Sequence, residues 1–389
     1  MDYSLDWLLY PLTSEQFYTD YFEKKYLHIA RENQSTYYSA LLNQDKIDQI
    51  LGGRLFRFPA LRLTKFGQEV NSSQYTNDKF VDMSLVYKHF LDGFTIILNA
   101  MHEQDPDLGA LVGKLSQITG HPFQTNVYIT PPNSQGFPAH YDSHDVFILQ
   151  VAGSKTWRIY KENPIELPTK LLEFQSEVHK PSESLEEVHL SEGDLLYIPR
   201  GYMHDATTSE SLSAHVTLGW LGFTWTDLMV QMILDFSKTN PSARRFLPNV
   251  KSINPAETVV YFKDLIEKFS ETVDLENAMN QFRQQLNSNL NFNIPNILKN
   301  TLGYHSLDLS TPLIKRKDLI FDLSIKANEV VMSWSSKEIN FPEFTYNTLK
   351  FIHHLATPFS GKDLPEDLDD EGKLVLLKRL MKEGVIRLA

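Results

Sequence analysis

Two histidines and an aspartate in the middle of the chain have side chains and a spacing that suit a metal-binding site. His140 and Asp142 form the only H-x-D in the chain. On an extended strand, alternation would put both side chains on the same face. An imidazole and a carboxylate on one face supply two ligands of a 2-His-1-carboxylate facial triad. Taken alone the pattern is common, and a surface histidine beside a turn aspartate would explain it equally well.

The second histidine follows a turn, an apolar run and another turn. Residues 192–203 contain a Gly-Asp turn, an apolar segment and a Pro-Arg-Gly turn, and His204 comes next. Hairpins separated by a long insert can face each other across the mouth of a barrel. A triad of this kind leaves three coordination positions open, which is enough for a bidentate keto acid and dioxygen. The ligand types admit manganese, cobalt and nickel as well as iron.

The elements around these residues predict a β domain. Short β segments separated by Pro and Gly turns are typical of a sandwich or barrel, including jelly rolls and cupins. The expected strands are residues 124–130, 145–151, 156–160, 194–198 and 213–220. Upstream, Thr13 and Gln16 are spaced as a capping box, which predicts a helix over 13–24 followed by a strand over 25–30.

Several of these segments, taken in order, resemble the JmjC-type ribosomal oxygenases. These form the cupin 4 family of 2-oxoglutarate oxygenases that hydroxylate ribosomal proteins. The resemblance is carried by HYD at 140–142, VFILQVAGSKTWR at 146–158, GDLLYIPRG at 193–201 with His204, and HVT at 215–217. It covers residues 120–222, and YFEKKYLHI at 21–29 is similar to the family's N-terminal element.

The resemblance implies a double-stranded β-helix with a helical dimerisation region and a winged-helix-like end. The corresponding domains are residues 1–225, 226–295 and 296–389. It also implies that His140, Asp142 and His204 bind Fe(II).

A second group of residues matches the family's 2-oxoglutarate site. Lys155 matches the lysine that pairs with the distal carboxylate of the cosubstrate, an end that needs a cation when buried. Thr217 and Tyr128 match hydroxyl donors near that carboxylate, and Asn126 matches a polar pocket residue on the strand face of Tyr128. Alternatively, Lys155 is a solvated turn lysine and the others are ordinary polar residues of a barrel interior.

The sequence around three further residues gives a less specific indication of their roles. His215 is expected to be a core histidine rather than a fourth ligand, and Arg200 is expected to fix its own Pro-Gly turn. His144, which follows the first ligand pair, fits a substrate cleft and an exposed loop equally well.

The chain after Trp225 is predicted to be helical at first. One apolar face comprises Leu228, Met229, Met232, Ile233 and Phe236, and another comprises Val259, Phe262, Ile266 and Phe269. Such faces predict an accessory bundle or a self-association surface. Residues 330–334, 346–355, 371–383 and 384–388 are expected as strand, helix, helix and strand, the order that ends a winged-helix domain. Acidic residues at least match basic ones there, so protein binding or a structural role is favoured over DNA reading.

Composition narrows the classes of protein. The formal net charge is −12, which argues against broad nucleic-acid binding. The absence of cysteine excludes disulfides, thiolate metal sites and cysteine nucleophiles, so a metal must be held by His, Asp or Glu. No signal peptide or apolar run of membrane-spanning length is visible, and we expect a soluble cytoplasmic protein without membrane association.

The resemblance implies a specific reaction. Iron(II), 2-oxoglutarate and dioxygen would give succinate, carbon dioxide and a hydroxylated arginine or histidine side chain in a ribosomal protein. The enzyme is expected to be a homodimer. Alternatives are an oxygenase acting on another protein or a small molecule, including a JmjC demethylase of methylated lysine. A metal-binding cupin that serves as an interaction module without catalysis is a further alternative.

Overall fold

The computed structural model describes residues 3–31, 34–248, 251, 254–289, 296–316, 319, 321–334, 337–355 and 357–389. The chain divides into two compact units. Unit 1 comprises Met1–Gly222, Asn291–Ile320 and Phe344–Ala389, and unit 2 comprises Phe223–Leu290 and Phe321–Glu343. The three-domain division expected from the sequence stays a prediction, and its boundary at residue 295 lies outside the described residues.

The N-terminal segment begins as predicted and ends its helix early. After α1 (Leu5–Leu9), helix α2 (Ser14–Asp20) carries the expected capping box between Thr13 and Gln16. The helix stops at Asp20 rather than at residue 24, because Glu23 adopts a positive φ of 57° and its amide donates to the Tyr197 hydroxyl. Strand β1 (Leu27–Ile29) then pairs with β11.

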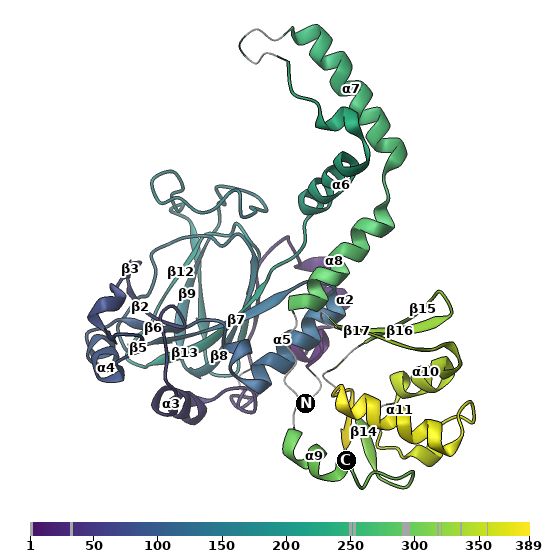
Figure 1. The fold of residues 1–389 in the computed structure, drawn as a ribbon. Helices are drawn as coiled ribbons and strands as arrows, with labels where there is room; N and C mark the ends of the chain where they lie inside the picture. Colours follow the sequence, from purple (N-terminus) through teal and green to yellow (C-terminus); the bar gives the residue numbers. More distant parts are fainter. Residues whose placement is uncertain are drawn as a thin grey trace. The chain divides into compact units, whose positions relative to one another are not determined.

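Residues 41–122 add helices and strands that had no sequence prediction. The helices are α3 (Gln44–Gly53), α4 (Met83–Leu91) and α5 (Pro106–Thr119). The strands are β2 (Leu61–Lys65), β3 (Gln68–Glu69), β4 (Thr76–Asn77), β5 (Phe80–Val81) and β6 (Thr95–Leu98). Side chains from these helices join one apolar core with the large sheet. Figure 1 shows the backbone of α3, α4 and α5 in the same part of the ribbon as the sheet strands.

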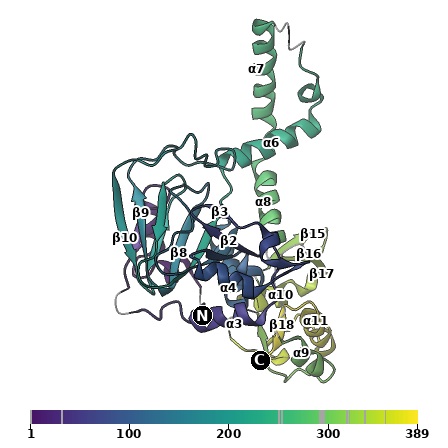
Figure 2. The same cartoon turned by 90° about the vertical axis from the view of Figure 1, so that its left-hand side faces the viewer.

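Two antiparallel sheets form the predicted jelly roll. The large sheet has the strand order β1-β11-β8-β13-β7-β6-β2-β3, and the small sheet has the order β10-β9-β12. Figure 2 shows β9 and β10 beside each other in front of β8. The strands of the barrel are β7 (Phe123–Thr130), β8 (Asp145–Gly153), β9 (Lys155–Tyr160), β10 (Leu185–Leu190), β11 (Leu195–Ile198), β12 (His204–Thr207) and β13 (Ser213–Trp220).

The barrel has apolar cores on both sides of the large sheet. Strand β8 is buried along nearly its whole length because each of its faces meets a different layer. Phe147 and Leu149 face the helices, whereas Val146 and Ile148 pack against the small sheet with Trp157. A continuous apolar run is the pattern expected of a strand covered on both faces.

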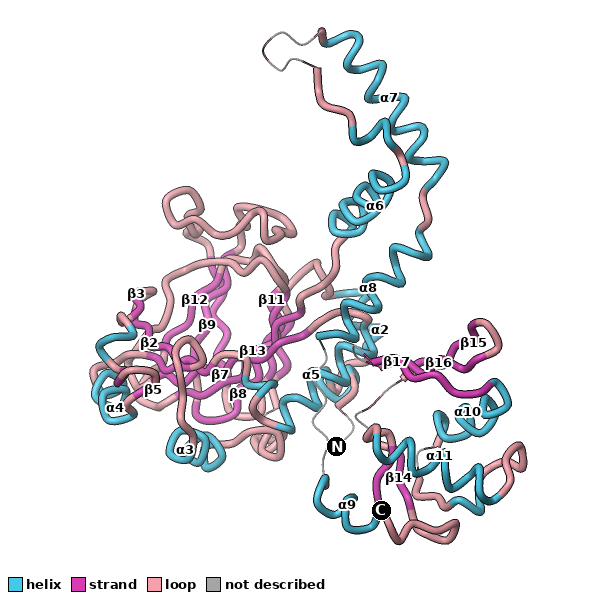
Figure 3. Tube along the Cα trace, in the orientation of Figure 1, coloured by secondary structure: helices cyan, strands magenta, loops and turns pink. Residues whose placement is uncertain are grey.

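Unit 2 contains three long helices and a small antiparallel sheet. The helices are α6 (Trp225–Thr239), α7 (Pro255–Thr272) and α8 (Leu275–Asn289), and the strands are β15 (Asp322–Lys326), β16 (Glu329–Trp334) and β17 (Lys337–Pro342). Figure 3 shows these helices in cyan. The predicted apolar faces of α6 and α7 exist and stay largely exposed: Met229 is 57 % exposed, Ile233 53 % and Phe262 59 %.

The C-terminal part of unit 1 contains the two helices and the terminal strand that were predicted, whereas the strand predicted at 330–334 is β16 of unit 2. The elements of this C-terminal part are α9 (Ile297–Tyr304), β14 (Leu313–Lys315), α10 (Tyr346–His354), α11 (Asp370–Lys382) and β18 (Ile386–Leu388). The terminal strand β18 pairs antiparallel with β14, and α11 buries Leu376, Leu377 and Leu380. None of the described helices is long and apolar enough to cross a membrane.

Candidate metal centre

The two segments that carry the predicted ligands are hydrogen-bonded to each other. The backbone amide of His140 donates to the carbonyl of His204 at 3.0 Å, and the amide of His204 donates back at 2.8 Å. The amide of Gly201 donates to the carbonyl of Asp142 at 3.0 Å. The prediction that His140 and Asp142 share a regular strand is wrong, because His140 makes one isolated bridge and Asp142 lies in irregular backbone. Backbone bonds between the segments set the ligand spacing instead.

An ion-pair network fixes the turn that leads to His204. Arg200 Nη1 lies 3.1 Å from Asp145 Oδ1, and Nη2 of the same guanidinium pairs with Glu23. The Tyr197 hydroxyl also donates to the Asp145 carboxylate. The expected role of Arg200 in holding its own turn is therefore confirmed. Asp145 follows the first ligand pair, so the network ties both ligand segments together.

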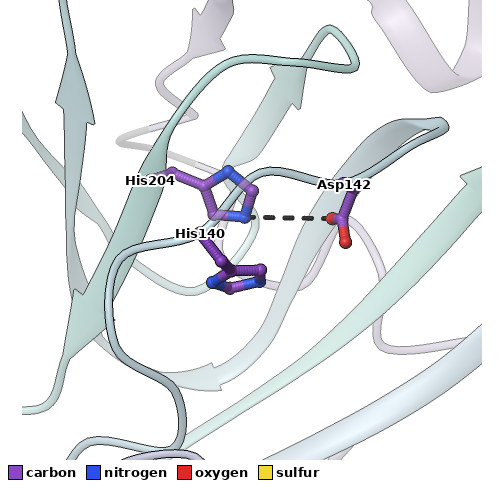
Figure 4. A group of neighbouring side chains, drawn as sticks. All are labelled: His140, Asp142 and His204. Atoms are coloured by element: carbon purple, nitrogen blue, oxygen red, sulfur yellow. Dashed lines mark ion pairs between the residues drawn. The ribbon is translucent and has the colours of Figure 1, made fainter. Parts of the chain in front are cut away.

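The side chains of His140, Asp142 and His204 converge, as Figure 4 shows. One potential ligand atom from each lies within 4.8 Å of the others, and no other group of this kind occurs in the described part of the chain. His204 Nε2 is 3.9 Å from Asp142 Oδ2, and the two imidazole rings are 4.6 Å apart between centroids. Two nitrogens and one oxygen on one side of a shared point form the donor set of a facial triad.

Each histidine ring is oriented by the backbone carbonyl two residues earlier. His140 Nδ1 lies 2.9 Å from the carbonyl oxygen of Pro138, and His204 Nδ1 lies 2.9 Å from that of Tyr202. A carbonyl only accepts, so Nδ1 of each ring carries the proton and donates it. This tautomer leaves the Nε2 lone pair free for a metal.

The electrostatic surroundings favour the protonation states that a metal requires. Burial, assisted by the neighbouring His140, lowers the pKa of His204, so its ring is neutral near pH 7. Burial alone would raise the pKa of Asp142, but His140, His144 and His204 hold that pKa below its usual value. Neutral imidazoles and an ionised carboxylate are the forms that bind divalent cations.

The triad opens into a cavity of about 260 Å³ that extends into the barrel. Lys155 lies in this cavity and is only 5 % exposed. Its Nζ donates to the Thr130 hydroxyl at 3.1 Å, and Thr130 in turn lies 3.1 Å from the hydroxyl of Thr95. Burial lowers the pKa of Lys155 to about 7, with no described carboxylate close enough to oppose the shift. The cavity therefore contains a buried amine that lacks an anionic partner among the described residues.

His215 and Tyr128 form one wall of the cavity. Their rings stack at 5.1 Å with an interplanar angle of 8°; His215 is buried and Tyr128 is half-buried. Burial and the nearby Lys155 hold the pKa of His215 well below its usual value, and its Nδ1 has no hydrogen-bond partner among the described residues. Burial and the Asp142 charge raise the pKa of Tyr128 to about 12. Both rings thus present neutral polar atoms to the cavity.

The remaining predicted residues separate into one that lines the cavity and one that does not. Thr217 lines it, opposite Asn126 of β7 and Ile148 of β8 in the strand register. Asn126 lies behind the wall: its Oδ1 accepts from the amide of Ala100 at 3.0 Å, and its side chain also bonds Tyr128. In this structure Asn126 supports Tyr128 rather than lining the cavity.

Sequence reasoning missed several residues of the cavity. Trp157 stands two positions after Lys155, so strand alternation from that residue could have found it. Thr130 does not line the cavity but accepts from the Lys155 amine, and it stands two positions after Tyr128. Asp205 follows His204 and binds the guanidinium of Arg158. Thr95 comes from β6, which had no sequence prediction, and no local signal points to it.

Comparison with known proteins gives one family match and a set of longer relatives. The JmjC domain model matches residues 104–228. "Bifunctional lysine-specific demethylase and histidyl-hydroxylase NO66" of Dictyostelium discoideum is 27% identical over 97% of this chain and 81% of its own length. Human "Ribosomal oxygenase 1" is 29% identical over 62% of this chain. The chain spans only 39% of that human protein and 49% of the matched Aedes aegypti relative.

Solved structures match the fold over almost the whole chain. The Escherichia coli ribosomal oxygenase YcfD, in its complex with cobalt and 2-oxoglutarate, superposes with a TM-score of 0.56 at 15% identity. The alignment covers 97% of this chain and 98% of that one. Residues 104–228 are therefore similar to a JmjC domain, and the fold of the chain is similar to that of a solved ribosomal oxygenase.

Proposed function

We propose that this protein is an iron(II)- and 2-oxoglutarate-dependent dioxygenase that hydroxylates a side chain of a ribosomal protein. The observation that carries the proposal is the presence of two complementary features in one cavity. His140, Asp142 and His204 offer a facial metal site, and Lys155 offers a buried cation without an anionic partner among the described residues. A barrel that only bound metal would have no need of the second feature.

The residues of the cavity fit a metal and a dicarboxylate together. His140 and His204 would each present Nε2 and Asp142 a carboxylate oxygen, leaving positions open for further ligands. When bound, the iron and its keto acid supply the activation of dioxygen and the oxidising power for hydroxylation. The protein's own contribution is to hold its ligands in one tautomer, to exclude water and to orient the reacting groups.

Lys155 would hold the distal end of the cosubstrate. A carboxylate beside its Nζ would stabilise the ammonium form, and the hydroxyl of Thr217, which lines the same cavity, offers a further hydrogen bond. A buried carboxylate costs several kcal/mol to desolvate unless it is paired in this way. Val146, Ile148 and Trp157 add apolar surface to the wall of the cavity.

The substrate assignment rests on the relatives. Their names include "Ribosomal oxygenase 1" and a histidyl-hydroxylase, and a solved neighbour is a ribosomal oxygenase. These names favour a histidine over an arginine as the target. The charge of −12 agrees with a basic substrate protein.

The test is an intact-mass comparison of all ribosomal proteins from the host, with this gene deleted and restored. One protein should lose the mass of one oxygen atom on deletion and regain it only when His140 and Asp142 are present. Unchanged masses under aerobic, iron-replete growth would exclude a ribosomal target. The metal and cosubstrate site would then be tested separately, by succinate release from 2-oxoglutarate.

A second candidate is the demethylation of methylated lysine, because the name of the Dictyostelium relative includes that activity. Hydroxylation of an N-methyl group releases formaldehyde, whereas hydroxylation of a histidine side-chain carbon adds a stable oxygen. Formaldehyde detection with methylated ribosomal proteins and methylated histone peptides separates the two reactions.

We further propose that the protein is a homodimer that associates through unit 2. The supporting observation is the exposure of large apolar side chains on two successive helices. They are Trp225, Met229, Val230, Ile233 and Leu234 on α6, and Val259, Val260, Phe262 and Ile266 on α7. Apolar surface of this extent on a soluble protein marks an interaction site.

A further inference from the structure

The loop between β9 and β10, residues 161–184, is attached to the segment that carries the first two metal ligands. Tyr141 stands between His140 and Asp142 but does not line the metal cavity, and it is only 2 % exposed. Its hydroxyl donates to the carbonyl of Leu172 at 3.0 Å. The residue between the ligands therefore holds the loop by a partly buried hydrogen bond.

Aromatic contacts also link the loop to the metal ligand His140. The Phe174 ring meets the Tyr141 ring edge to face at 5.4 Å, and it lies 6.4 Å from the ring of His140. His179 lies on another side of Tyr141, with its ring at 5.2 Å and its Nδ1 3.3 Å from the hydroxyl. The amide of Gln175 donates to the same Nδ1 at 3.0 Å. This hydrogen bond links the backbone at residue 175 to the His179 side chain within the loop.

The start of the loop is attached to the second ligand segment. A Cβ on Gly201 would lie 2.5 Å from the carbonyl oxygen of Ile165 and 2.7 Å from Pro168, so only glycine allows this approach. Gly201 adopts φ +87° in the turn before His204. The loop thus contacts both segments that converge at the metal centre.

The outer side of the loop carries apolar and acidic side chains. Leu171 is 85 % exposed and Val178 is 68 % exposed. Acidic residues outnumber basic ones in the loop: Glu162, Glu166, Glu173, Glu177 and Glu183 against Lys161, Lys170 and Lys180. An apolar and acidic surface beside a catalytic cavity matches a basic polypeptide that also carries an apolar side chain.

We propose that residues 161–184 form a substrate-docking loop for a basic polypeptide, and that Tyr141 is the positioning residue that holds this loop against the metal-ligand segment. The inference rests on the proposed function for the identity of the substrate. It assigns to Tyr141 a role in polypeptide affinity rather than in metal or cosubstrate binding. Phe174 serves the same role from the loop side.

The first experiment measures how firmly the loop is held against the metal-ligand segment, and it requires no enzymatic activity. The Tyr141→Phe protein, which keeps the ring and loses the hydroxyl, is digested with a glutamate-specific protease, and cleavage after Glu173 and Glu177 is followed by mass spectrometry. Loss of one hydrogen bond should speed this cleavage about fivefold. Tyr37→Phe is the matched control, because Tyr37 also donates to a backbone carbonyl but lies far along the chain from the loop. Phe174→Ala repeats the test from the loop side of the contact. Because Phe174 is only half-buried, this change endangers folding less than a change at Tyr141.

The second experiment measures polypeptide affinity in the protein without iron. A fluorescent peptide of lysine and leucine is the probe, and a glutamate and leucine peptide is its negative counterpart. The Glu173→Lys/Glu177→Lys protein should bind the basic probe about tenfold more weakly. Glu257→Lys/Glu271→Lys on α7, with the same change in net charge, should bind it like the wild type. Binding by the wild type should also weaken as salt is raised.

If Tyr141 only positions the loop, its loss should change the affinity for the polypeptide and leave the affinities for metal and cosubstrate unchanged. Tyr141→Phe should weaken the basic probe about fivefold while cobalt and 2-oxoglutarate bind as in the wild type. Equal loss of all three, or unchanged protease cleavage in both Tyr141→Phe and Phe174→Ala, would overturn the assignment. If the wild type released no succinate from 2-oxoglutarate but the loop variants behaved as described, the proposed oxygenase function would fail and the docking loop would stand.

Discussion

At the scale of single residues, Lys155 and the triad divide the cavity into two functional ends. The triad offers two imidazole nitrogens and one anionic oxygen, whereas Lys155 offers a proton whose presence depends on its neighbours. Each end can be tested without the other. Three predictions belong to this scale.

Removal of the carboxylate should abolish metal binding. In Asp142→Ala the two imidazoles remain but the anionic ligand is lost, and affinity for cobalt or iron(II) should fall by more than about 100-fold. Anaerobic iron(II) with 2-oxoglutarate should give a weak visible charge-transfer band in the wild type and none in the variant. Asp205→Asn is the nearby control, since Asp205 binds Arg158 rather than the metal group. A band of wild-type intensity in Asp142→Ala would show that the metal lies elsewhere.

Loss of the buried amine should weaken the cosubstrate and spare the metal. Removing one partner of a buried charge pair costs about 2–5 kcal/mol, so Lys155→Ala should bind 2-oxoglutarate at least about 30-fold more weakly. Cobalt affinity, measured without 2-oxoglutarate, should not change. Unaltered 2-oxoglutarate affinity in this variant would exclude Lys155 from the dicarboxylate site.

The affinity for 2-oxoglutarate should depend on pH through Lys155. Its pKa in the free protein is about 7, lowered by burial, so the amine is charged below pH 7 and increasingly neutral above it. A bound carboxylate raises that pKa again, so binding above pH 7 must take up a proton. The dissociation constant should therefore be flat below pH 7 and rise about tenfold per pH unit above it. Lys155→Arg, which stays charged, should remove this slope, and a slope that persists in the arginine variant would assign it to another group.

Among the strands of the barrel, those with a local apolar pattern in the sequence could be predicted, and those without one could not. Barrel strands β7, β8, β9, β11 and β13 were found because their apolar runs and turns are local signals, and β13 was predicted with both of its ends correct. Strand β10 had no prediction. Strand β12 was not predicted, because residues 204–207 are mainly polar and gain their strand from pairing with β9. Helices α3 to α5 have apolar faces, but they lie in a segment without chemical motifs. Thr95 consequently could not be placed in the cavity.

The apolar faces of α6 and α7 lead to a prediction at the same scale. Charges at Ile233 and Phe262, which are 53 % and 59 % exposed, should prevent self-association because an unpaired charge cannot be buried in an apolar interface. Ile233→Glu/Phe262→Glu should elute as a monomer in size-exclusion chromatography with light scattering, whereas the wild type should elute as a dimer. Val375→Glu, at an exposed apolar position of α11, is the control. A monomeric wild type would refute the dimer.

At the scale of the whole molecule, the two compact units should respond differently to ligands. The triad and Lys155 lie entirely in unit 1. Ligand at about 100 times its dissociation constant stabilises the folded state by about 2.7 kcal/mol. In calorimetry, cobalt with 2-oxoglutarate should raise the unfolding temperature of unit 1 by several degrees and leave that of unit 2 unchanged. An equal shift of both units would show that they unfold as one cooperative body.

The carbonyl bonds to the histidine rings have a consequence for chemical rescue. Pro138 and Tyr202 hold the rings through main-chain oxygens, and the main-chain bridge between His140 and His204 needs no particular side chain. A glycine in place of His140 would therefore leave a vacancy with the ring's acceptor still in position. Free imidazole added to His140→Gly could occupy that vacancy, donate to the Pro138 carbonyl and turn its other nitrogen toward Asp142 and His204. The backbone would then act as a receptor for a diffusible ligand.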